Sequence, residues 1–178
     1  MLKNYSTLKQ TSSNGTKLRK DISKRNETPR RKKPVISIET LQQHNHRIAE
    51  HSKVLSVLIR DRELCDTQVM CDVFFSYVDA VKEHLDTEDR NIYQPMLVHS
   101  DGDIKNTAGL FMSGSIEIKR VIAEYTKQWC RKSTLRIKNH DQFVSDTEDI
   151  FELVWKRIID ESEHLYPAFN RATQKEAA

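Results

Sequence analysis

The stretch His84-Leu85-Asp86-Thr87-Glu88, followed by Ile92-Tyr93-Gln94-Pro95, decides how this 178-residue chain is expected to fold. A related stretch, Arg157-Ile158-Ile159-Asp160-Glu161 followed by Leu165-Tyr166-Pro167, repeats it near the other end. In each copy a basic or titratable residue stands four positions before a glutamate, so both side chains share one helix face. Each copy then reaches an aliphatic-tyrosine pair and a proline, which we expect to end the helix. Helical bundles build metal sites from such pairs.

Four segments around these stretches show the 3-4 apolar spacing of helices that face a bundle interior. The first begins at the capping residue Ser37, and short polar connections near 61–66, 100–103 and 132–139 separate the segments. Their inward positions run, in order, from Leu41 to Leu58, Met70 to Ile92, Ala108 to Trp129 and Phe143 to Leu165. We therefore predict an all-α protein, an antiparallel up-down-up-down four-helix bundle over residues 37–169.

The charge of the chain is unevenly distributed. Residues 1–36 contain eleven Lys and Arg but only two acidic residues, a net charge of +9, whereas the rest of the chain carries −6. With few apolar residues at any period, residues 1–36 are predicted to form a disordered basic arm, and residues 170–178 a C-terminal tail. The arm suits an acidic protein, a nucleic acid or an anionic membrane surface. A solvated linker has the same composition.

Other sequence features limit the class of protein. We expect no membrane span because no run of 18 apolar residues occurs, and no secretory signal because the N-terminus lacks an apolar region. Cys65, Cys71 and Cys130 are odd in number and lack CxxC spacing, which predicts reduced thiols and a cytoplasmic location. Neither a glycine-rich phosphate loop nor a Ser-His-Asp set is present, so we do not expect an enzyme.

Polar residues on the apolar stripes are the candidate site, because an unpaired buried charge is costly. They are His44 and His51 on the first helix, His84 and Glu88 on the second, and Glu161 on the fourth. In an antiparallel bundle these residues lie at matching heights. Imidazole nitrogens with carboxylates suit Fe, Mn or Zn better than Ca or Mg. The other histidines are predicted to lie at the surface: His46, His99, His140 and His164.

Taken in order, these motifs resemble the hemerythrin-like (HHE cation-binding) domains over roughly residues 38–169. The resemblance implies an antiparallel four-helix bundle around a non-haem, usually di-iron, centre that serves in oxygen binding, iron or redox sensing, or nitric-oxide-related roles. By position, it assigns His51 or His44 as the ligand from the first helix, His84 and Glu88 as the pair from the second, and Glu161 as the carboxylate from the fourth.

The chain departs from the family pattern at two places. Residues 110–117 contain no histidine, and Arg157 stands where a ligand histidine is expected. The remaining residues do not complete a di-iron centre, but they can hold a single divalent metal, iron first. Alternatively, Arg157 lies between Glu88 and Glu161 and replaces the charge of the cation, in a metal-free bundle that serves as a regulatory interaction module. The sequence does not indicate an oligomeric state.

Overall fold

The computed structural model describes residues 36–132 and 134–175, and these residues are almost entirely helical, so the all-α prediction is confirmed. The chain divides into two units, Met1–Lys33 and Pro34–Ala178. Apart from Ile36, the predicted basic arm lies outside the described residues. The elements are α1 (Ile38–Leu58), α2 (Arg62–Cys65), α3 (Gln68–Glu88), η1 (Asp89–Tyr93), α4 (Gln94–Leu97), α5 (Gly102–Trp129), β1 (Cys130–Arg131), β2 (Thr134–Leu135), α6 (His140–Asp160), η2 (Glu161–Leu165) and α7 (Tyr166–Lys175).

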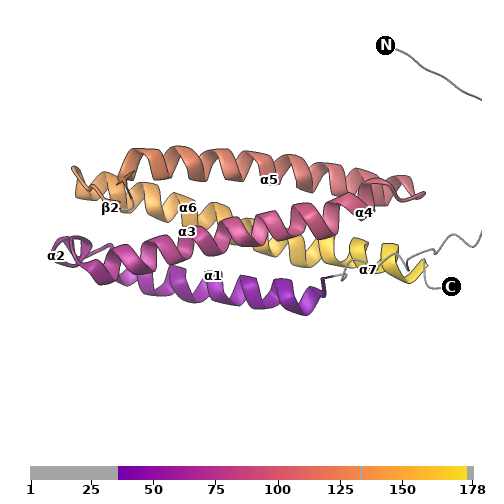
Figure 1. The fold of residues 1–178 in the computed structure, drawn as a ribbon, viewed down its shortest axis with the longest axis horizontal. Helices are drawn as coiled ribbons and strands as arrows, with labels where there is room; N and C mark the ends of the chain where they lie inside the picture. The colour runs from indigo at the N-terminus through magenta and orange to yellow at the C-terminus, as the bar shows by residue number, and fades with distance from the viewer. Residues whose placement is uncertain (1–35, 133, 176–178) are drawn as a thin grey trace, which may run out of the picture. The chain divides into compact units, whose positions relative to one another are not determined.

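The long helices α1, α3, α5 and α6 lie side by side in the second unit (Figure 1). Each begins at a side chain that caps its free backbone amides, as expected for Ser, Thr, Asp and Asn at this position. The caps are Ser37, Thr67, Asp101 and Asn139. Between α5 and α6, β2 lies within the predicted polar connection 132–139 and pairs antiparallel with β1, which precedes it.

The apolar side chains form two clusters. The cluster with more residues, called the longer cluster below, includes Leu55, Phe74 and Phe143. The cluster with fewer residues, called the shorter cluster, includes Leu41 and Tyr93. Along α3 the longer cluster ends at Leu85, and the shorter begins at Ile92 in η1. Along α6 the change falls between Ile158 and Leu165. The polar residues of both repeated stretches therefore lie between the two clusters.

Both repeated stretches continue through their prolines. The π-helical turn η1 leads into α4, which contains Pro95, and η2 leads into α7, which contains Pro167. The prediction that these prolines end their helices is wrong. A π-turn widens the helix before the proline, and proline is tolerated in a first turn, where its missing N–H would have no intrahelical partner.

The C-terminal part of the chain is helical beyond the predicted bundle boundary at residue 169. Helix α7 continues to Lys175 and buries Phe169 and Ala172 in the shorter cluster. Within the described ranges, the helices are too short or too polar to cross a membrane. The cysteines Cys65, Cys71 and Cys130 are free thiols.

Candidate metal centre

Three buried side chains converge between the two apolar clusters. His84 and Glu88 extend from the last turns of α3, and Glu161 is the first residue of η2. His84 is 2% exposed and both glutamates are 0% exposed. The distance from His84 Nε2 to Glu161 Oε2 is 3.0 Å and that to Glu88 Oε1 is 3.7 Å. One ligand atom from each residue lies within 4.8 Å of the others, so the group can bind a metal ion.

Arg157 lies on the other side of the two carboxylates. Its Nε donates to Glu161 Oε1, and its Nη2 lies 3.4 Å from Glu88 Oε2 and donates to the Tyr93 hydroxyl. The Tyr93 hydroxyl in turn donates to Glu88 Oε2 at 2.7 Å. The guanidinium thus places one positive charge beside both glutamates, where burial makes an unpaired carboxylate costly.

The two oxygens of each carboxylate have different surroundings. Glu161 Oε1 and Glu88 Oε2 face Arg157, whereas Glu161 Oε2 and Glu88 Oε1 face His84. Among the described residues, Glu88 Oε1 is buried and has no hydrogen-bond partner. A cation between His84 and the two glutamates would satisfy this oxygen without displacing Arg157.

Helix α5 makes room for the guanidinium. Arg157 Nη1 donates to the Phe111 backbone carbonyl at 3.1 Å, and Arg157 Cζ lies 4.6 Å from the centre of the Phe111 ring. A Cβ atom at Gly114 would lie only 2.9 Å from Arg157 Nη1. Gly114 is therefore the residue that lets a buried arginine fit against α5.

A second tyrosine connects the site to α1. The Tyr166 hydroxyl lies 3.5 Å from Glu161 Oε2 as a donor, and Asn45 Nδ2 donates to the same hydroxyl at 3.2 Å. Tyr93 and Tyr166 occupy equivalent places in the two repeated stretches, five residues after a glutamate. Each tyrosine thus holds the glutamate of its own stretch.

Burial controls the protonation of the group. It raises the pKa of Glu88 to about 8, with a further increase from the neighbouring Glu161 carboxylate. Burial also raises the pKa of Glu161, against the opposing effect of Arg157. The pKa of His84 is lowered by burial, and Glu88 opposes this shift. Without a metal, Glu88 is therefore mostly protonated and His84 is neutral near pH 7.

The two histidines predicted from the first helix lie outside this group. His44 is half-buried, and its ring centre lies 6.1 Å from that of His84 in an edge-on contact. His51 is also half-buried. The Nδ1 atoms of both are buried without a hydrogen-bond partner among the described residues. Neither histidine belongs to the group of converging ligand atoms. Their assignment as ligands stays a prediction.

Two of the four histidines expected at the surface are not there. His99 is 9% exposed, and its Nδ1 accepts from the Asp101 backbone amide at 3.0 Å. His140 is half-buried with its Nε2 2.7 Å from the Ile59 carbonyl oxygen. Both rings complete hydrogen bonds at helix ends, which the helical pattern alone does not reveal. His46 and His164 are exposed, as predicted.

The residues present fit one divalent transition metal. In a tetrahedral or octahedral site with bonds of about 2.1 Å, neighbouring ligand atoms are roughly 3.0–3.4 Å apart. The distances from His84 Nε2 to the two carboxylates are close to this range. A second metal would have to replace the Arg157 guanidinium, which contacts the opposite oxygens of both carboxylates. The donor set therefore fits a single ion.

Sequence reasoning missed the residues that support Arg157. The repeated pattern identifies Tyr93 only as part of an aliphatic-tyrosine pair, and it does not connect Phe111 or Gly114 with the site. The sequence feature that indicates this packing is a glycine within the third helix together with an arginine at a ligand position, since a bulky guanidinium needs a small neighbour.

Comparison of the chain with protein-family models, with curated proteins and with solved structures gives no match. The interpretation of the site therefore rests on its own geometry.

Proposed function

We propose that residues 37–169 form an antiparallel four-helix bundle of the hemerythrin-like type that binds one divalent non-haem metal, iron first. His84, Glu88 and Glu161 would hold the ion. The side-by-side arrangement of the long helices supports the bundle (Figure 1). The role that follows is oxygen, iron or redox sensing or binding, for which a bound iron would supply a redox-active centre with open coordination positions.

One observation carries this proposal: both carboxylates give one oxygen to Arg157 and turn the other toward His84. In this arrangement the guanidinium takes the place of a second cation. Glu88 Oε1 is the oxygen that a single metal would engage, because it is buried and unpartnered among the residues described. An unpaired polar group of this kind costs free energy that a cation would recover.

Calorimetric titration of chelator-treated protein with Fe(II) under anaerobic conditions, and with Mn(II) and Zn(II), tests the proposal. We expect one ion per chain in the wild type and loss of binding in Glu88→Gln, which keeps the shape of the side chain. His46→Ala is the matched control, because His46 is an exposed histidine outside the group. Saturable binding that is equal in Glu88→Gln would refute the site.

A metal-free bundle is the second candidate, and the contacts of Arg157 favour it. Arg157, Glu161, His84, Tyr93 and Glu88 form a continuous buried network. In that case the domain would act as a regulatory interaction module, as a bundle with a neutral polar layer can. Binding of none of the three metals, with a melting temperature unchanged by metal or chelator, would support this function over the first.

A further inference from the structure

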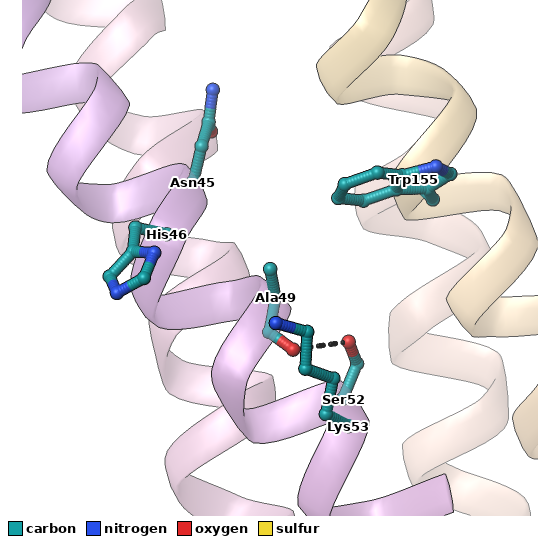
Figure 2. A pocket seen from close by; sticks show the side chains of 6 residues that line it. All are labelled: Asn45, His46, Ala49, Ser52, Lys53 and Trp155. Atoms are coloured by element: carbon teal, nitrogen blue, oxygen red, sulfur yellow. Dashed lines mark hydrogen bonds between the residues drawn. The ribbon is translucent and has the colours of Figure 1, made fainter.

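A groove lies between α1 and α6 on the surface of the described part of the chain (Figure 2). Its volume is about 450 Å³, within the usual range of ligand sites. An adjoining hollow of about 320 Å³ shares Ser52, Lys53 and Trp155 with it, so the two form one continuous groove. The groove is separate from the buried metal site.

The two walls of the groove differ in size. Figure 2 shows the Trp155 ring projecting from α6 toward α1, where Ala49 lies among longer side chains. Trp155 is 53% exposed, although its neighbour Val154 belongs to the core. A large exposed indole opposite a small residue leaves space for a flat ring, and aromatic side chains prefer to stack on other rings.

A cationic group on α1 lies beside this space (Figure 2). Lys53 Nζ pairs with Glu50 Oε1 at 2.7 Å, but the two side chains are 72% and 51% exposed. Such an exposed pair contributes little, so an acid in the groove can compete for the ammonium. Asn45 also lines the groove, but it is 9% exposed, its Oδ1 is buried and its Nδ2 donates to Tyr166, so Lys53 is the group that a ligand can reach.

The length of the groove sets the size of a ligand. Asn45 and Lys53, which both line it, are eight residues apart on α1, which is about 12 Å along a helix axis. A fused two-ring acid fits within this length. Its flat face would lie on Trp155.

We propose that this groove binds a small planar aromatic acid. The ring stacks on Trp155 opposite Ala49, and the acid pairs with Lys53. This inference does not depend on the metal, since none of the proposed metal ligands lines the groove.

Isothermal titration of the full chain with 2-naphthoate, in the presence of a chelator, tests the inference. We expect one molecule per chain. Ala49→Leu should abolish binding by filling the groove, and Lys53→Met should weaken it by up to about fivefold by removing an exposed ion pair. The control is Leu110→Ala, an exposed apolar residue of α5 that does not line the groove and should leave binding unchanged.

Cyclohexanecarboxylate, which has the acid but not the flat ring, should bind about three- to tenfold more weakly than the naphthoate, by an amount typical of a stacking contact. Circular dichroism checks that each variant is folded, and Trp155→Leu provides a second way to remove the stacking wall. The inference is overturned if the naphthoate does not saturate at one molecule, if the Ala49 and Lys53 variants bind like the wild type, or if the saturated acid binds equally well.

Discussion

Replacing Gly114 with alanine tests how closely α5 and the Arg157 guanidinium fit together. Alanine in a helix interior normally stabilises by about 1 kcal/mol relative to glycine. At Gly114, however, the new Cβ would lie 2.9 Å from Arg157 Nη1. An arginine tip usually moves away from such a contact at little cost, but this guanidinium is hydrogen-bonded to Glu161, Tyr93 and the Phe111 carbonyl. The substitution should therefore displace the guanidinium and weaken these hydrogen bonds.

The expected loss follows from the contacts that Nη1 makes. A hydrogen bond from a charged donor contributes roughly 1.5–3 kcal/mol, and the cation–π contact with Phe111 about 0.5–1 kcal/mol. Set against the gain of about 1 kcal/mol in helix propensity, Gly114→Ala should lower the free energy of unfolding by about 1–3 kcal/mol. Gly109→Ala is the matched control on the same helix, since nothing lies within 4 Å of its added Cβ. That variant should gain about 1 kcal/mol.

Urea unfolding of the metal-free protein, followed by far-UV circular dichroism, measures both variants. The account predicts opposite signs for the two glycines. If Gly114→Ala stabilised the protein as much as Gly109→Ala does, Arg157 would not be confined against α5, and the interpretation of the guanidinium as a fixed cation would be wrong.

Three further predictions concern the polar layer. In chelator, the free energy of unfolding measured with urea should fall between pH 6.5 and 8, by at most about 1.4 kcal/mol per pH unit. The cause is that folded Glu88 keeps until about pH 8 a proton that the unfolded chain loses near the ordinary pKa of 4.5. The pKa of His84 is lowered from its ordinary 6.5, so its opposite effect is confined to lower pH, and Glu88→Gln should flatten the profile. Tyr93→Phe should lower the free energy of unfolding, measured by heat or urea, by about 1–3 kcal/mol, because it removes a hydrogen-bond partner from Glu88 and Arg157. The control is Tyr77→Phe, which should be neutral or stabilising because the buried Tyr77 hydroxyl has no partner in the described ranges. Arg157→His should bind metal at least tenfold more tightly in calorimetry, because it removes a positive charge close to the ion. Unchanged affinity would count against a metal next to the two glutamates.

The helices and the core could be predicted because burial follows the 3.6-residue period. Phe143, Thr147, Ile150, Val154 and Ile158 are all buried, as the stripe of the fourth segment indicates. The pairing of His84 with Glu88 follows from the same period, since four residues return a side chain to one face. Glu161 joins them from η2 through the packing of the helices.

The rest depended on local geometry that periodicity does not contain. Pro95 and Pro167 predicted helix ends, but the π-turns before them allow the helix to continue. The contacts of Arg157 depend on the absence of a side chain at Gly114, from a different helix. The groove beside Trp155 depends on how α1 and α6 pack, which a single helix pattern does not determine.

Anomalous diffraction from crystals grown with Mn(II) or anaerobic Fe(II), with data collected on either side of the metal absorption edge, tests the central claim most directly. The account predicts one anomalous peak, about 2.0–2.2 Å from His84 Nε2, Glu88 Oε1 and Glu161 Oε2, with Arg157 still bound to the opposite carboxylate oxygens. A site without such a peak, or two peaks with Arg157 displaced, would contradict it.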